Sequence, residues 1–210
     1  MKNFLRPIIT GFLLMFTLGC QQQPNPEHVA TIAPASLSDE TKRIITGLML
    51  DQVKVLDVDK NTELVTTMYA FVERFEKGVK QEQELDMGME IRKKSQLLFA
   101  YDWKEQEDEK EHWLRMRASV IDGGSIGATE KDVIFKGSRG GSVTHQLSMS
   151  KPIKLNQPLT VMAVLEDNKQ GIIFREQLVT QYDETGELPS EFLEYDRVIL
   201  FRVKLMEGRS

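Results

Sequence analysis

The residue types that most often carry chemistry are few in this chain and stand far apart. Its 210 residues include three histidines, His28, His112 and His145, and a single cysteine, Cys20. Nucleophilic catalysis needs a nucleophile, a base and a group that orients the base, and zinc needs ligands at short, regular spacing. The three histidines fit neither requirement. We therefore predict no catalytic residue, no metal ligand and no cofactor.

Acidic residues are plentiful by comparison. The chain holds 32 Asp and Glu, and two carboxylates held roughly 5–9 Å apart can hydrolyse a glycosidic bond. Nothing in the spacing of the acids selects a pair. His112 follows Glu111 directly, and we interpret the two as solvated neighbours instead of weak metal ligands. Because two of the many acids could still meet in the folded chain, an extracytoplasmic hydrolase that acts through paired carboxylates stays as one alternative function.

Two short stretches begin like ligand-binding loops and then depart from them. Asp57 to Asn61 starts like a calcium loop, but positions six and twelve of that pattern hold Thr62 and Met68, where Gly and Glu are required. The glycine-rich stretch 123–131 lacks the spacing of a phosphate-binding loop. We interpret the first stretch as a turn between strands. Residues 122–128, which include the glycines of the second stretch, are predicted to be a flexible loop.

Two tryptophans flank a charged run and form the candidate binding surface. Trp103 and Trp113 stand on either side of residues 104–112, which we expect to be a solvated loop. Arg115 and Arg117 alternate with Trp113, so the three share one face of a strand. Exposed tryptophans would bind a sugar or a partner, whereas buried ones would belong to the core, which is the interpretation we prefer. The face with two arginines is expected to be wet.

The elements that must position these residues are mostly strands. Apolar residues alternate with polar ones from Gln52 onward, and turn residues recur every ten to fifteen positions. Hairpins are predicted over residues 64–85 and 95–120, and further strands over 132–136, 143–149, 159–165, 172–181 and 197–206. No regular alternation with helices is present. The fold class we predict is mainly β, an antiparallel β-sandwich over residues 51–208, with an immunoglobulin-like architecture as one option.

One short helix is predicted to precede the sandwich, over residues 36–50. Ser36 and Asp39 resemble a capping pair at its start. Apolar residues follow near helical spacing. A helix on the membrane surface is the other interpretation, but Lys42 and Arg43 are the only cations on its polar face. We therefore expect the helix to pack on the domain.

The first twenty residues have the pattern of an export signal. Lys2 and Arg6 precede an apolar run from residue 7 to 18. That run is shorter than the roughly 20 residues of a membrane-spanning helix and has the length of a signal-peptide core. Polar residues follow it at once, so no anchor sequence continues the run.

The junction Thr17-Leu18-Gly19-Cys20 resembles the lipobox of bacterial lipoproteins. The resemblance implies that a diacylglycerol is attached to the thiol of Cys20 and that a peptidase cuts between Gly19 and Cys20. Residues 1–19 would then be a signal peptide, and residues 20–35, rich in Gln and Pro, a tether. The turn at residues 71–83 (FVERFEKGVKQEQ) also resembles uncharacterised lipoproteins of low-GC Gram-positive bacteria.

Charge restricts the partners of such a protein. Removal of residues 1–19 takes away Lys2 and Arg6 and lowers the net charge from −5 to −7. An acidic chain is a poor ligand for nucleic acid, so we expect none. The predicted partners are the bilayer, through acylated Cys20, and an unidentified protein or cell-wall component.

The sequence thus predicts a membrane-anchored extracytoplasmic lipoprotein with a non-catalytic interaction or structural role in the cell envelope. It would lie on the outer face of the cell membrane, or on the outer membrane of a Gram-negative cell. The alternatives are the hydrolase described above and an accessory solute- or sugar-binding lipoprotein.

Overall fold

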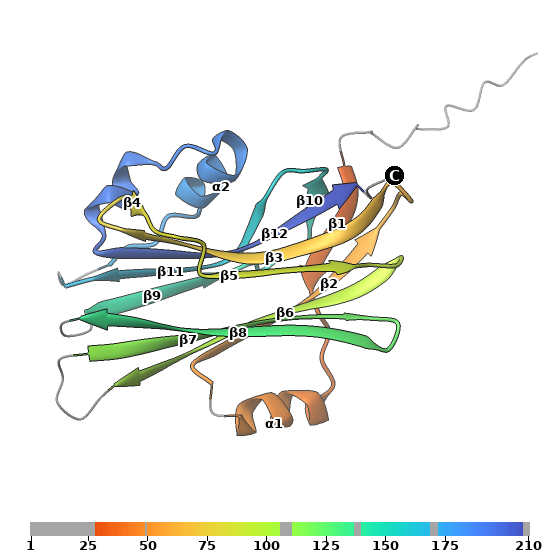
Figure 1. The fold of residues 1–210 in the computed structure, drawn as a ribbon, viewed down its shortest axis with the longest axis horizontal. Coiled ribbons are helices and arrows are strands. Elements are labelled where there is room, and N and C mark those ends of the chain that lie inside the picture. The colour runs from red at the N-terminus through yellow and green to blue at the C-terminus, as the bar shows by residue number, and fades with distance from the viewer. Residues whose placement is uncertain (1–27, 49, 106–110, 137–139, 169–171, 208–210) are drawn as a thin grey trace, which may run out of the picture.

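The computed structural model describes residues 28–48, 50–105, 111–136, 140–168 and 172–207. Two antiparallel sheets pack face to face (Figure 1), which confirms the predicted mainly β sandwich. The described strands number twelve, so the sandwich is larger than the roughly seven to nine strands of an immunoglobulin domain.

Each sheet combines strands that are far apart in the sequence. The first sheet has the order β10-β1-β2-β6-β7-β8, and the second has β4-β3-β12-β11-β9 with β5 also paired to β3. The strands of the first sheet are β1 (His28–Pro34), β2 (Gln52–Lys60), β6 (Lys94–Glu105), β7 (Glu111–Asp122), β8 (Ser125–Lys136) and β10 (Lys151–Lys154). Those of the second are β3 (Val65–Glu76), β4 (Val79–Lys80), β5 (Leu85–Glu90), β9 (Gly141–Gln146), β11 (Leu159–Asp167) and β12 (Arg197–Glu207).

The main core lies between the two sheets and follows from strand alternation. On β7 the even-numbered residues are buried, and the odd-numbered ones before Ile121 are half-buried. Phe99 of the first sheet meets Phe201 of the second with ring centroids 5.5 Å apart. A second, smaller core lies on the outer face of the second sheet, where Phe75 and Leu165 pack against Tyr182 of helix α2 (Glu176–Thr185).

The predicted tether is wrong over residues 28–34, because these form β1 inside the first sheet. β1 pairs with β2 on one side and β10 on the other. Val29, Ala30 and Ile32 are buried, and this burial outweighs the preference of nearby prolines for isolated extended chain. Pro34 ends the strand, where a missing backbone N–H is tolerated. The sandwich therefore begins at residue 28 and not at residue 51; residues 1–27, with Gly19 and Cys20, lie outside the described residues.

The helix predicted to pack on the domain is present but shorter and exposed. Helix α1 (Asp39–Gly47) begins after Ser38, whose side chain accepts a hydrogen bond from the N–H of Thr41. None of its residues is buried, and Ile44, like the C-cap residue Leu48, is 60% exposed. The prediction of a helix packed on the domain is therefore wrong. It also does not precede the sandwich, because β1 comes first.

A second helix replaces a predicted strand. Residues 172–181 were expected to form a strand, but α2 occupies Glu176–Thr185, and a 3-10 helix, η1 (Ser190–Glu194), follows. Leu178, Val179 and Tyr182 recur at helical spacing and are buried against the second sheet. Gly186 ends α2 in the left-handed conformation, φ 72°. Figure 1 shows α2 over the second sheet and α1 on the opposite side of the sandwich.

The flexible loop predicted over residues 122–128 is also wrong. Gly123 and Gly124 form a tight turn with φ of 54° and 96°, which glycine adopts without strain. β8 then begins at Ser125. The hairpin of β6 and β7 matches the predicted one over residues 95–120, and its connecting residues 106–110 lie outside the described residues.

The sandwich has two ends along the direction of its strands, which we call the N-terminal end and the far end. The N-terminal end holds the start of β1, the β2–β3 connection and the β7–β8 turn. The far end holds the start of β7, the end of β8 and the β3–β4 turn.

Candidate functional site

The structure separates the four residues of the predicted binding surface. Trp103 faces the main core and is 8% exposed. Its ring centroid lies 5.4 Å from that of His112 and 5.7 Å from that of Phe135. Trp103 is thus a core residue, as preferred from the sequence, and it cannot share a surface with Trp113.

Trp113, Arg115 and Arg117 do share the outer face of the first sheet. Arg115 donates two hydrogen bonds to Asp132, at 2.7 and 2.8 Å, and these bonds lower the pKa of Asp132. Arg117 donates to Glu130 in the same cross-strand row. Both cations therefore have partners on β8. This face is a solvated ladder of ion pairs, which agrees with the expected wet surface and leaves little free charge for a ligand.

A buried polar cluster lies instead at the far end, between the sheets. The guanidinium of Arg197 donates to Glu166 at 2.9 Å and lies 3.1 Å from Nε2 of His112. It also stacks over the ring of Phe135, 4.3 Å from the centroid. Glu166 and His112 are 1% and 2% exposed, respectively. Because a guanidinium only donates, Nε2 of His112 accepts, and the charge of Arg197 is held in one fixed position.

A hollow of about 740 Å³ opens above this cluster, and we call it the far-end hollow. It is lined by Glu76, Lys77, Val79, Gln81, Lys136, Asn168, Asp196 and Arg197. Lys77 and Lys136 are exposed and form no ion pair with any described residue. Glu76 is paired with Arg74, and Asp196 accepts hydrogen bonds from Asn168.

The chemistry of the far-end hollow suits an anionic group. The ammonium groups of Lys77 and Lys136 lie in its lining, and the two carboxylates there, Glu76 and Asp196, already have partners. The amides of Gln81 and Asn168 can donate or accept. The lining combines residues of β3, β4, β8 and β12 with Asn168, the residue after β11, so only the folded sandwich assembles it. No sequence pattern marks these positions, because they lie at separate strand ends.

A second buried cluster joins α2 to the second sheet, and we call it the α2 clamp. Arg202 donates to Glu73 at 2.5 Å and to Asp183 at 2.9 Å, and its side chain is only 4% exposed. Tyr182 and Lys80 also donate to Glu73. Each acid of the clamp is thus held by several donors, since Thr160 donates twice to Asp183.

The two carboxylates of the clamp are shifted in opposite directions. Burial alone would raise the pKa of Glu73, but hydrogen bonds and charge from Lys80, Arg202 and Tyr182 lower it overall. Burial raises the pKa of Asp183 more than Thr160 and Arg202 lower it. Burial also raises the pKa of Tyr182 to about 12, with Glu73 adding to the shift. Neither acid lines the far-end hollow, so we assign the clamp the role of fixing α2 on the sheet.

One motif escaped the sequence analysis. Gly123 to Gly127 reads Gly-x-Ser-x-Gly, the pattern around the nucleophile of many hydrolases. That pattern requires a turn from a strand into a helix, whereas Ser125 here opens strand β8 after a hairpin turn. His112 pairs with the opposite end of β8, at Phe135. The motif therefore lacks both its structural context and a nearby base.

The remaining predicted motifs also hold no site. Asp57 and Asp59 belong to strand β2 and not to a turn, and Asn61 binds the backbone oxygen of His28. Among the residues that the structure describes, no three His, Cys, Asp or Glu side chains gather as a metal site would require. Within the same residues, no helix has the length and apolar character needed to cross a bilayer.

Fold and site together define an antiparallel β-sandwich domain with a hollow at one end, whose lining includes two lysines that form no ion pair with any described residue. Residues 31–205 match the family model of the YgaN domain, and the chain belongs to this family. The description of that family names no activity. Comparison with curated proteins and with solved structures gave no match.

Proposed function

We propose that this protein is a lipid-anchored extracytoplasmic lipoprotein with a non-catalytic interaction role in the cell envelope. The observation that carries the proposal is the lipobox-like junction that ends at Cys20, with only seven residues between Cys20 and the start of β1 at His28. Acyl chains contribute about 0.8 kcal/mol per buried methylene, and one chain alone binds a membrane only marginally. Several chains on Cys20 would hold the sandwich firmly.

The position of β1 supports an orientation for the anchored domain. The anchor would join the sandwich at the N-terminal end. β6 and β7 have twelve residues each, so the far end lies about 40 Å away along the strands. The far-end hollow would then project from the membrane, where a soluble or wall-bound partner can reach it.

The charges of the hollow indicate the kind of partner. Lys77 and Lys136 present positive charge on a protein whose net charge is negative overall. A carboxylate-bearing segment of a protein or wall polymer fits this arrangement. Nucleic acid remains an unsuitable partner, because the mature chain would carry a net charge near −7.

The anchor is tested by metabolic labelling with palmitate. We expect label on the wild-type protein and none on Cys20→Ser, which should accumulate unprocessed or leave the membrane fraction. Ser36→Ala, another small change outside the strands, serves as the control and should be labelled normally. Equal labelling of Cys20→Ser and wild type would contradict the anchor.

The interaction role is tested by photocrosslinking in whole cells. A crosslinking side chain at Lys136 should trap a partner, and Lys77→Glu should reduce the yield. The matched control is Lys42→Glu on α1, whose side chain is 61% exposed and which lies outside the hollow. A yield that falls equally for both variants would argue against the far-end hollow as the binding site.

A further inference from the structure

The N-terminal end has a hollow of its own, of about 810 Å³, which we call the N-terminal hollow. It is lined by residues of β3, β5, β7, β8 and β12 and of the connection after β5: Thr66, Thr67, Tyr69, Met89, Glu90, Ile91, Arg92, Asp122, Ser125, Met206 and Glu207. Its place on the sandwich matters because β1 begins at the same end, so any membrane anchor on Cys20 would face this hollow and not the far-end one.

Two backbone hydrogen bonds fix how near this hollow lies to the start of β1. Asn61 N–H donates to Val29 O, and Lys60 N–H donates to Lys93 O, each at 3.0 Å. Since β1, β2 and β6 are neighbours in the sheet, Val29 and Lys93 are separated by two strand spacings, about 10 Å. Arg92, next to Lys93, lines the hollow. Seven residues, 21–27, separate Cys20 from His28, so the two residues cannot be more than about 29 Å apart.

The lining of the N-terminal hollow carries charges of both signs. Arg92 is 75% exposed and lies 3.7 Å from Asp122, which is only 6% exposed and set back in the sheet. Lys93, beside it, is exposed and has no ion pair among the described residues. Glu90 and Glu207, both exposed, lie in the same lining.

Mixed charge selects the class of ligand. A purely anionic group would meet Glu90 and Glu207, and a purely cationic one would meet Arg92. A zwitterion with a phosphate and an ammonium satisfies both, and the hydroxyls of Thr66 and Ser125 add donors for the phosphate oxygens. A primary ammonium can donate hydrogen bonds to the two glutamates, whereas a trimethylated ammonium cannot.

We infer that the N-terminal hollow binds the head group of a zwitterionic phospholipid with a primary ammonium, of the phosphatidylethanolamine class. The inference rests on the proposed anchor at Cys20, which holds this end of the sandwich within reach of the bilayer. Arg92 takes the phosphate, and Glu90 and Glu207 take the ammonium. The membrane then holds the domain upright, with the far end outward.

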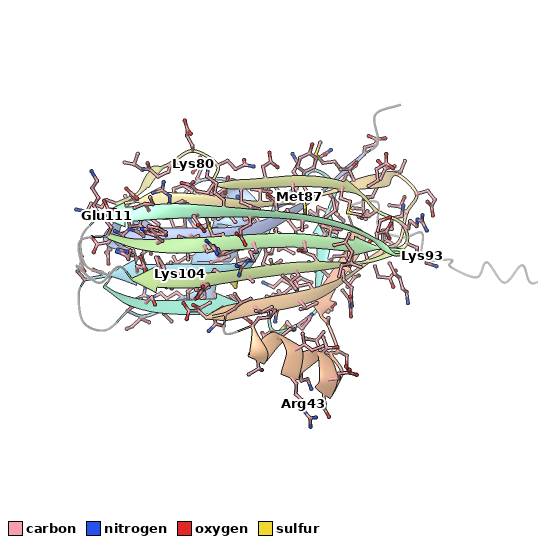
Figure 2. All side chains as sticks on the ribbon, turned by 60° about the horizontal axis from the view of Figure 1, so that its bottom comes forward. Arg43, Lys80, Met87, Lys93, Lys104 and Glu111 are labelled. Atoms are coloured by element: carbon pink, nitrogen blue, oxygen red, sulfur yellow. The ribbon has the colours of Figure 1, made fainter. Side chains whose placement is uncertain are left out.

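The test uses the acylated full-length mature protein reconstituted in vesicles. Acylation blocks the thiol of Cys20, so a single introduced cysteine is the only free thiol that a fluorophore can label. Lys93→Cys reports on the N-terminal end, and Lys104→Cys reports on the other end of β6 (Figure 2). Quenching by a lipid with a nitroxide on its head group measures how close each probe lies to the membrane.

We expect strong quenching of the Lys93→Cys probe in phosphatidylcholine vesicles that contain phosphatidylethanolamine, and weak quenching in phosphatidylcholine alone. The Lys104→Cys probe should be quenched weakly in both. Arg92→Ala should lower the ratio of docked to undocked protein about tenfold or more, as expected for the loss of one charge-assisted hydrogen bond to a phosphate. Glu90→Gln with Glu207→Gln should remove the preference for phosphatidylethanolamine.

Equal quenching of the two probes, or docking only with phosphatidylglycerol, would overturn the inference. Vesicle flotation and the mass of the N-terminal peptide distinguish failure of the anchor from failure of the head-group inference. If the protein does not float with the vesicles and the mass of its N-terminal peptide lacks acyl chains, the proposed function fails. If it floats and is acylated but shows no preference for the ethanolamine lipid, the head-group inference alone fails.

Discussion

Replacing Arg202 by methionine should destabilise the protein strongly, because the guanidinium holds two buried carboxylates. Glu73 and Asp183 are 7% and 9% exposed in their side chains, and Arg202 itself is 4% exposed. Removing one partner of a buried ion pair costs about 3–5 kcal/mol, since the remaining charge stays buried. Methionine keeps much of the apolar volume, so the loss reports on charge and not on packing.

For a domain of this size, 1 kcal/mol lowers the melting temperature by roughly 2–4 °C, so the expected decrease is about 6–20 °C. The assay is urea and thermal unfolding of the mature chain, followed by the fluorescence of Trp103 and Trp113 and by circular dichroism. Arg117→Met is the matched control. Its guanidinium pairs with Glu130 on the solvated sheet face, where an ion pair contributes about 1 kcal/mol or less.

A rescue experiment tests the reasoning more sharply. Adding Glu73→Gln and Asp183→Asn to Arg202→Met removes the two buried negative charges that have lost the guanidinium, and should restore part of the lost stability. If Arg202→Met costs no more than Arg117→Met, or if the triple variant is no more stable than Arg202→Met, the electrostatic account of the α2 clamp is wrong.

Three further predictions follow from the fold. Because the pKa of Glu73 is lowered in the folded protein, ionised Glu73 adds to the free energy of unfolding. This contribution is complete above the ordinary pKa of 4.5 and is lost as the pH falls through the lowered pKa. The destabilisation by Glu73→Gln, measured by urea unfolding, should therefore be largest near neutral pH and become smaller in acid. A Cβ on Gly140 would lie 2.4 Å from the backbone oxygen of Asp167, so Gly140→Ala should lower the free energy of unfolding by about 1–3 kcal/mol, and an unchanged melting curve would contradict this. Leu48→Ser, at a position that is 60% exposed, should change the free energy of unfolding by less than about 0.5 kcal/mol. Leu178→Ala, at the buried face of α2, should lower it by about 2–5 kcal/mol. If the two substitutions lower it by similar amounts, α1 packs on the domain after all.

The class of fold could be predicted because alternation along single strands records burial directly. β7 shows this best, since Leu114, Met116 and Ala118 face the core and Arg115 and Arg117 face solvent. Both the hairpin and the wet face followed from that pattern. Strand order did not follow, because β12 pairs with β3 across more than a hundred residues of chain, and no local pattern encodes such a pairing.

A local sequence signal misleads where tertiary packing overrides it. The prolines near β1 suggested a tether, yet Ile32 is fully buried between β10 and β2. The β-branched and aromatic residues of 172–181 suggested a strand, although Leu178, Val179 and Tyr182 lie at helical spacing before Gly186. Counting those matches would have favoured the helix, so this signal was present in the sequence.

The polar clusters, by contrast, had no signal to find. Arg202 and Glu73 are 129 residues apart in the sequence and adjacent only because β3 and β12 pair, and α2 then brings Asp183 onto the same guanidinium. On an outer strand face, an arginine flanked by apolar residues reads as solvated. It is buried here because a helix covers that face, so burial of charge on the second sheet is a consequence of α2. The same logic explains why the clamp fixes the position of the helix. α2 cannot leave without exposing an apolar sheet face, separating Asp183 from Arg202 and breaking the hydrogen bond from Tyr182 to Glu73.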